Sequence, residues 1–127
     1  PMAGLKNRPS QYRVALDPLT NAELTGMVLV AGAQHATLKE VSRTYVELAA
    51  IGLTQQDLVK NSLLPEQEAA HDKLAQALSQ REQQALQQFP ENLRTLPSDR
   101  LPLKPCNTVG LSALRGLLAD SATGAPM

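Results

Sequence analysis

Large aromatic side chains are scarce in this sequence of 127 residues, which has two tyrosines, one phenylalanine and no tryptophan. A hydrophobic core must therefore be built from Leu, Val, Ile, Ala and Met. Small domains bury a smaller fraction of their surface than large ones do, so a core without rings is thin for a monomer of this length. Pairing of two chains would enlarge the core, and the composition therefore favours a dimer.

Cysteine pairs, long apolar runs and a signal peptide are also missing. Cys106 is the single cysteine, which excludes an intramolecular disulfide and a cysteine-based zinc site and favours a reducing compartment. The longest apolar run, residues 27–33, is too short to cross a bilayer. Residues 1–16 lack the apolar stretch of a signal peptide. We therefore expect a cytoplasmic protein without a membrane segment.

The sequence has no excess of positive charge, because its 12 basic residues balance its 12 acidic residues. The net charge by itself therefore does not indicate a nucleic-acid partner. The distribution is more informative. Residues 1–16 contain Lys6, Arg8 and Arg13 and no acidic residue, so any positive field lies at the N-terminus.

Motifs for catalysis and metal binding are absent as well. His35 and His71 are far apart and have no cysteine or carboxylate at ligand spacing, and Cys106 has no histidine near it in sequence. The sequence contains neither a glycine-rich phosphate loop nor a G-x-S-x-G motif. These absences predict a protein that is not an enzyme and that holds no metal and no cofactor.

What is present begins with a polar arm and a short alternating segment. Residues 4–10 are polar and contain a proline, which predicts a flexible arm. Residues 11–16 then alternate, with Tyr12, Val14 and Leu16 on one face and Gln11, Arg13 and Ala15 on the other. This period of two is typical of a half-buried strand. The Asp-Pro pair at 17–18 ends the strand, since proline cannot donate to a ladder.

Two helices are predicted next. Apolar residues from Leu19 to Ala31 follow an approximate helical spacing, which predicts a helix that begins between residues 18 and 21 and ends between residues 32 and 35. Thr37 and Glu40 form a Thr-x-x-Glu capping box, which predicts a second helix from Thr37 to Ile51. Gly52 and Leu53 suit the end of that helix. The expected core residues are Leu16, Leu24, Val28, Val41, Tyr45 and Leu48.

The C-terminal half is predicted to be helical with an extended connector. The pattern predicts a short helix over residues 55–64, a long helix over 66–88, a proline-rich connector over 90–107 and a last short helix over 109–118. The tail from Asp120 is expected to be disordered. The narrow apolar stripe of the 66–88 helix is typical of packing on the protein's own core or of a seam with a second protein.

A lone strand leaves its backbone groups unpaired, and the same strand of a second chain would pair it about a two-fold axis. A strand followed by two helices resembles the ribbon-helix-helix family of Arc- and MetJ-type repressors. The matching segments are Tyr-Arg-Val-Ala-Leu-Asp-Pro at 12–18 and Thr-Leu-Lys-Glu-Val-Ser-Arg at 37–43. The resemblance implies a mainly α fold and a homodimer or a tetramer. Its dimer core would comprise Tyr12, Val14, Leu16, Val41, Tyr45 and Leu48.

The resemblance also implies a function. A two-stranded ribbon fits the major groove of double-stranded DNA. By position, the base-reading residues would be Gln11, Arg13 and Ala15. The phosphate contacts would be Lys6, Arg8, Thr37 and Lys39, because the N-terminus of a helix favours an anion.

The domain organisation and function follow from these expectations. The divisions are an arm (1–10), a ribbon-helix-helix module (11–53), a helical extension (54–89) and a connector with a short helix and tail (90–127). The function would be that of a sequence-specific DNA-binding protein, either a transcriptional repressor or an accessory factor of a plasmid relaxosome. The alternative is a helical interaction module that binds no nucleic acid, such as an adaptor, an antitoxin-like protein or an inhibitor.

Overall fold

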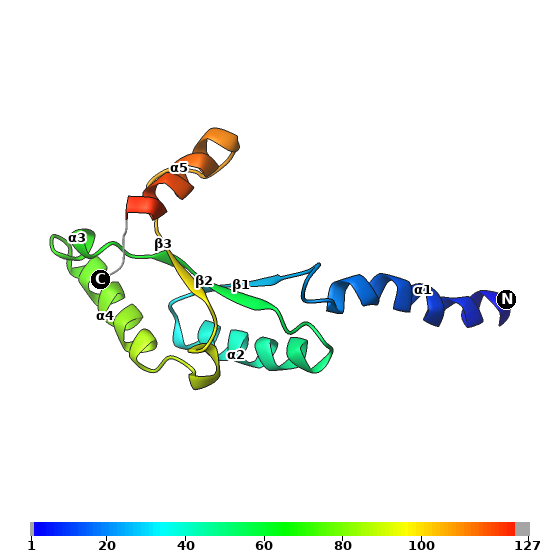
Figure 1. Ribbon diagram of the computed structural model, residues 1–127. Coiled ribbons are helices and arrows are strands. Elements are labelled where there is room, and N and C mark those ends of the chain that lie inside the picture. Colours follow the sequence, from blue (N-terminus) through cyan, green and yellow to red (C-terminus); the bar gives the residue numbers. More distant parts are fainter. Residues whose placement is uncertain (1, 124–127) are drawn as a thin grey trace.

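The computed structural model describes the backbone of residues 2–123 and the side-chain burial of residues 10–119. Helices and strands alternate along it (Figure 1). Their order is α1 (Met2–Thr20), β1 (Met27–Gly32), α2 (His35–Ala50), β2 (Gln56–Leu63), α3 (Glu66–Ala69), α4 (Lys73–Gln87), the 3₁₀ helix η1 (Glu91–Leu93), β3 (Ser98–Pro102) and α5 (Leu111–Thr123). The fold is therefore α/β, and the prediction of a mainly α ribbon-helix-helix fold is wrong.

A three-stranded sheet in the order β1-β2-β3 organises the molecule. Both strand pairs are parallel, with Leu29 opposite Leu58 and Lys60 opposite Arg100. Parallel neighbours need a long crossover, which α2 provides between β1 and β2, while α3, α4 and η1 provide it between β2 and β3. The module boundary predicted at residue 53 therefore falls inside a strand–helix–strand unit whose two strands hydrogen-bond to each other.

The segment predicted to be the first helix contains strand β1. Leu29 and Ala31 are buried, whereas Val28 and Val30 are 54% and 57% exposed. This is the two-residue period of a strand, and β-branched valines favour it. The helical prediction failed because five consecutive apolar residues, Met27 to Ala31, fit a helical stripe and a strand equally well.

The short helix predicted over residues 55–64 is also wrong, because strand β2 occupies this segment. Leu58 and Leu63 are buried on it. Gln56, the first residue of β2, is buried. Its side-chain amide donates to the carbonyl oxygens of Tyr45 (3.1 Å) and Leu53 (2.8 Å), and these bonds fix the start of β2 against α2 and the residues that follow it. The predicted extended connector contains η1 and the edge strand β3.

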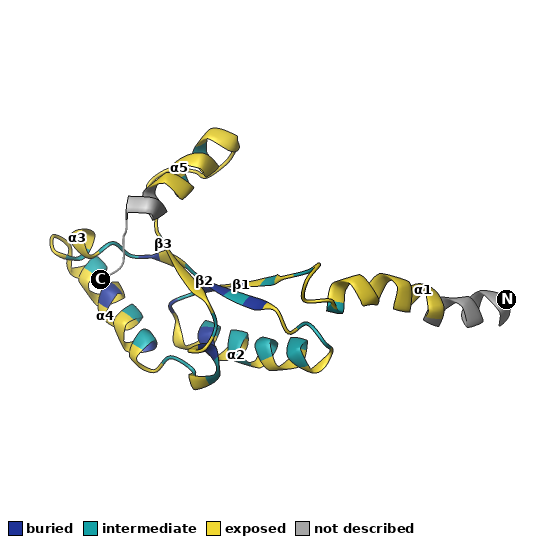
Figure 2. Ribbon diagram, in the orientation of Figure 1, coloured by how far each residue is buried: buried dark blue, intermediate teal, exposed yellow. Residues whose placement is uncertain are grey.

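The predicted strand at residues 11–16 and the predicted flexible arm before it both lie in helix α1. A helix pairs its backbone groups locally, so this segment needs no strand from a second chain. Figure 2 shows the described part of α1 almost wholly exposed, and Tyr12 and Val14 are 64% and 74% exposed. The alternation of their side chains therefore reflects no buried face.

Helix α2 was predicted closely, but not its first residue. It begins at His35, after Gln34 as the N-cap residue, instead of at Thr37. Its end was predicted correctly: Gly52 has a φ of +99°, and the N–H groups of Gly52 and Leu53 donate to the carbonyl oxygens of Ala49 (3.1 Å) and Leu48 (3.0 Å). This pair of bonds is the Schellman motif. A Cβ at Gly52 would also come within 3.1 Å of the Thr20 side chain.

The long helix predicted over residues 66–88 is divided into α3 and α4. Asp72 begins α4 as its N-cap and accepts hydrogen bonds from the N–H groups of Leu74 (2.6 Å) and Ala75 (3.4 Å). The last predicted helix is confirmed as α5, which continues to Thr123 through the first residues of the predicted disordered tail. The remainder of that predicted tail, residues 124–127, lies outside the described residues.

The core lies between the sheet and the two helices α2 and α4. One buried cluster comprises Leu29, Ala31, Leu38, Leu58, Ala85 and Leu93. Because residues of α2 and α4 meet the same side chains of β1 and β2, both helices cover one face of the sheet (Figure 1). Of the predicted core residues, Val41, Tyr45 and Leu48 are partly buried against this cluster. Leu16, Leu24 and Val28 are exposed, so their predicted burial is wrong.

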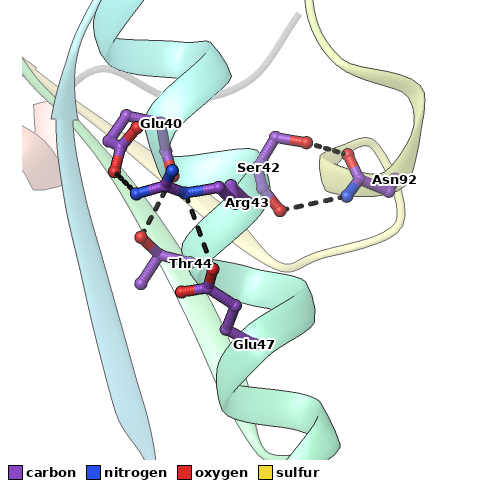
Figure 3. A network of polar contacts seen from close by, with 6 residues as sticks. All are labelled: Glu40, Ser42, Arg43, Thr44, Glu47 and Asn92. Atoms are coloured by element: carbon purple, nitrogen blue, oxygen red, sulfur yellow. Dashed lines mark hydrogen bonds and ion pairs between the residues drawn. The ribbon is translucent and has the colours of Figure 1, made fainter.

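A polar contact joins α2 to η1 at the side of the core (Figure 3). The Ser42 hydroxyl donates to Asn92 Oδ1 (2.8 Å), and Asn92 Nδ2 donates to the Ser42 carbonyl oxygen (3.3 Å). On the same helix, Arg43 pairs with Glu40 (2.6 Å) and Glu47 (3.6 Å). The Ser42–Asn92 pair is partly buried and connects segments fifty residues apart, so it fixes the loop before β3 against α2.

Among the helices of the described residues, none combines the length and the apolar character that are needed to cross a membrane.

Candidate functional site

A cavity of about 430 Å³ lies where the carboxyl ends of the parallel strands meet helix α4. Ala33 follows β1, Ser62 and Leu64 lie at the end of β2, and Leu103 follows β3. The remaining lining comes from α2 and its N-cap (Gln34 and His35) and from α4 (Leu78, Arg81, Glu82, Gln84, Ala85 and Gln88). In open α/β sheets the carboxyl edge is where ligands bind, so this cavity is the candidate site.

The walls of the cavity combine small, apolar and amide side chains. Buried Ala33 and Ala85 are small and leave the space open. Leu64, Leu78 and Leu103 make apolar surface, and the amides of Gln34, Gln84 and Gln88 offer both donors and acceptors. A site that is partly apolar with a few polar groups suits a small organic ligand.

The end of β2 has an irregular backbone at this cavity. Ser62 has a φ of +57°, in the left-handed region, and the pairing with β3 shifts register between Lys60 and Leu63. Non-glycine residues adopt this conformation at a cost, and such residues concentrate at binding sites. The carboxylate of Glu82 accepts from the N–H of Leu64 (3.0 and 3.3 Å). This contact fixes the loop after β2 to α4 across the cavity.

The N-terminus of α2 opens at the same edge. Gln34 and His35 line the cavity, Gln34 makes no side-chain capping bond, and the first turn has no acidic residue. The first intrahelical donor is the N–H of Leu38, which bonds to the Gln34 carbonyl oxygen (2.9 Å). The preceding N–H groups and the positive end of the helix dipole favour a negatively charged ligand group.

The residues predicted to contact DNA lie on two separate helices and not on a two-stranded ribbon. Gln11, Arg13 and Ala15 are exposed on helix α1, which extends away from the sheet in Figure 1. Thr37 and Lys39 lie on α2, where the Thr37 hydroxyl donates to Gln34 Oε1 (3.3 Å). Lys6 and Arg8 belong to α1, and their side chains lie outside the described part of the structure.

The predicted dimer core is divided between two places. Tyr12, Val14 and Leu16 are exposed on α1, whereas Val41, Tyr45 and Leu48 pack against the core of their own chain. One argument for a homodimer or tetramer was a strand without a partner. Since residues 11–16 are helical and the strands of the chain pair with one another, that argument no longer holds.

Sequence analysis missed the residues that line the cavity, and it considered His35 only as a metal ligand without partners. No motif marks Ser62, Arg81 or Gln84, because they come from separate elements. His71 and Cys106 are exposed. Across the described residues, no group of three or more His, Cys, Asp or Glu side chains is arranged to hold a metal ion.

Comparison with known proteins gives one consistent result. The family model described as "Anion-transporting ATPase" matches residues 1–120. A protein of Acidiphilium multivorum named "Arsenical pump-driving ATPase" is 53% identical over 127 residues, which is 100% of this chain and 22% of that protein. A protein of the same name from Escherichia coli is 50% identical over 126 residues, 99% of this chain and 22% of that protein. The chain thus spans about a fifth of the length of these relatives.

These matches overturn the sequence-based function. They replace the ribbon-helix-helix resemblance, and neither the family nor the relatives provide a basis for DNA binding, repression or a relaxosome role. The alternative of an adaptor, antitoxin-like or inhibitor module is likewise unsupported. The prediction that the protein is not an enzyme is also wrong, because the matched family and its named members are ATPases. That prediction had relied on the absence of catalytic and metal-binding motifs from these 127 residues.

Proposed function

This chain belongs to the anion-transporting ATPase family, and we propose that it is a nucleotide-binding part of an ATPase that drives an arsenical pump. The cavity at the carboxyl edge of its sheet would contact the nucleotide. The pump role comes from the names of the relatives. The predicted cytoplasmic location belongs to the same proposal, because ATP is supplied there.

The single observation that supports a nucleotide at this place is the position of the cavity. The ends of β1, β2 and β3 all contribute to it, and this edge is the usual ligand site of α/β sheets. Its volume of about 430 Å³ falls within the range of small-ligand sites. Apolar walls and side-chain amides suit a flat heterocyclic base, which needs both stacking surface and hydrogen-bond partners.

Two further groups at the edge fit a nucleotide. Asn61 is exposed at the end of β2, next to Ser62, and an Asn amide can pair with both a donor and an acceptor of adenine. The open N-terminus of α2 and Arg81 supply positive potential for a phosphate group.

The uncovered face of the sheet supports a longer ATPase. Parallel sheets are normally buried on both faces, yet Val28 and Val30 on the face away from α2 and α4 are more than half exposed. Since the relatives are several times longer than this chain, we assign the covering of this face to other parts of such a protein. Hydrolysis and coupling to the pump would involve those parts together with the cavity described here.

The test compares two neighbouring substitutions on α4 in the full polypeptide that carries this chain. Gln84 lines the cavity and Gln83 does not, although both side chains are exposed. The larger side chain of Gln84→Trp occupies cavity volume that the nucleotide needs. We therefore expect it to weaken ATP binding by about tenfold or more, the effect of losing one good polar contact. Gln83→Trp should bind ATP as the parent does.

Nucleotide affinity is measured by equilibrium titration, and ATP hydrolysis by phosphate release. Circular dichroism establishes that both variants are folded. Equal affinities for the parent, Gln84→Trp and Gln83→Trp would refute the proposal that this cavity contacts the nucleotide. A loss of hydrolysis with no change in affinity would also refute it.

A further inference from the structure

A second cavity lies on the helix-covered side of the sheet, between β2, β3, the end of α4 and η1. Its volume is about 390 Å³. Its lining residues are Lys60, Leu86, Phe89, Leu93, Arg94, Ser98 and Arg100. None of them lines the cavity at the carboxyl edge. The two cavities are therefore lined by different residues and are treated as separate sites.

The lining is positively charged and contains no acidic residue. Lys60 and Arg100 are register partners on the adjacent strands β2 and β3, and two like charges directly opposite each other destabilise a sheet. Within the described residues, no carboxylate lies at ion-pair distance from either of them. The arrangement therefore concentrates positive charge that the described chain does not neutralise.

Arg94 adds a third cation to the rim. Its Nε pairs with Glu91 Oε2 at 3.2 Å, but the Glu91 side chain is 92% exposed. An ion pair that is so open to water contributes little, so Arg94 can turn to another anion at small cost. Ser98, two residues before Arg100 on the same strand, adds a hydroxyl donor.

Lys60 shows how the charge is held in this cavity. Its Nζ lies 4.7 Å from the centre of the Phe89 ring, in cation–π contact. Burial, and secondarily the charge of Arg100, lower the pKa of Lys60 below its ordinary value. Both causes disfavour the charged ammonium, and an anion between Lys60 and Arg100 would remove the second and oppose the first.

We propose that this cavity binds a small phosphate-bearing anion, held by Lys60, Arg94 and Arg100. Phosphate oxygens match both the guanidinium forks and the ammonium. Ser98 donates one more hydrogen bond, and Leu86, Phe89 and Leu93 make an apolar wall for the organic part of the ligand. The site is distinct from the proposed nucleotide cavity and does not depend on it.

The test uses pyrophosphate as the probe and the full polypeptide that carries this chain. Calorimetric titration at low ionic strength should show binding. Lys60→Met and Arg100→Gln should each weaken it by about tenfold or more, because each removes a charge-assisted contact. Lys39→Met is the matched control, since Lys39 is exposed on α2 and lies in neither cavity. It should leave the affinity unchanged.

A second arm separates this site from the nucleotide cavity. Gln84→Trp should retain the pyrophosphate binding that Lys60→Met and Arg100→Gln weaken, because Gln84 lines only the other cavity. Three outcomes would overturn the proposal: no binding by the folded parent, equal losses in Lys60→Met and Lys39→Met, or loss of the Lys60-dependent binding in Gln84→Trp. Arg100 is exposed, so its substitution leaves no void in the core. Arg100→Gln therefore keeps the test valid if Lys60→Met is unstable.

Discussion

Truncating Leu58 to alanine tests the sheet-based core most directly. Leu58 lies on the central strand β2, is 1% exposed and packs with the buried leucines 29, 38 and 93. A Leu→Ala change at such a position removes transfer free energy and leaves a cavity, which together cost about 2–5 kcal/mol. Neighbours on β1, α2 and η1 limit collapse into the cavity, so we expect Leu58→Ala to lower the free energy of unfolding by roughly 3–5 kcal/mol.

Leu24→Ala is the matched control. The helical interpretation of the sequence placed Leu24 in the core and did not include Leu58 among the core residues, whereas Leu24 is 70% exposed in the structure. We expect Leu24→Ala to change the free energy of unfolding by less than about 0.5 kcal/mol. Leu48→Ala should fall between the two, because Leu48 is only partly buried.

Urea unfolding followed by circular dichroism measures all three variants, and an unchanged m-value shows that the comparison is sound. If Leu24→Ala proved as costly as Leu58→Ala, the packing of β2 against α2 and α4 would be incorrect. A Leu58→Ala variant as stable as the parent would refute the core assignment by itself.

Three further predictions concern polar groups. Asp72→Ala should lower the free energy of unfolding by about 1 kcal/mol, because α4 loses its N-cap acceptor. Asp72→Asn should keep most of the parent's stability, and urea titration measures both variants. Ser42→Ala and Asn92→Ala should each cost about 1 kcal/mol, and a double-mutant cycle should show coupling, since the two side chains bond to each other. Because the pKa of Lys60 is lowered in the folded state, the stability linked to its titration is fully present above pH 10.5 and is lost as the pH falls through the lowered pKa. Lys60→Met should remove this dependence of stability on pH, and identical pH profiles for Lys60→Met and the parent would contradict the prediction.

Local signals allowed parts of the fold to be predicted correctly. The end of α2 followed from Gly52 and Leu53, because a glycine with positive φ closes a helix wherever the helix lies in the fold. Helix α5 followed from its spaced leucines. These features depend on residues close together in sequence, and they were predicted although the fold class was wrong.

The strands could not be predicted in the same way. A six-residue alternation at residues 11–16 indicated a strand, yet the segment is helical. The true strand β1 is a continuous apolar run, which is typical of parallel strands but also fits a buried helix. Strand β2 contains Lys60 and Asn61 among its apolar residues, and its central place in the sheet depends on partners far away in sequence.

The candidate site was missed for the same reason, and one change of interpretation would have revealed it. If Met27 to Ala31 is taken as a strand, the capped helix after it and the apolar segment after Gly52 make a strand–helix–strand unit, whose two strands are parallel. The carboxyl ends of those strands, at Ala33 and Ser62, must then lie at one edge of the sheet, beside the N-terminus of the connecting helix. That edge is where α/β proteins bind ligands, and the structure has its cavity there. The residues that line it carry no motif of their own, so the site becomes predictable only after the topology is known.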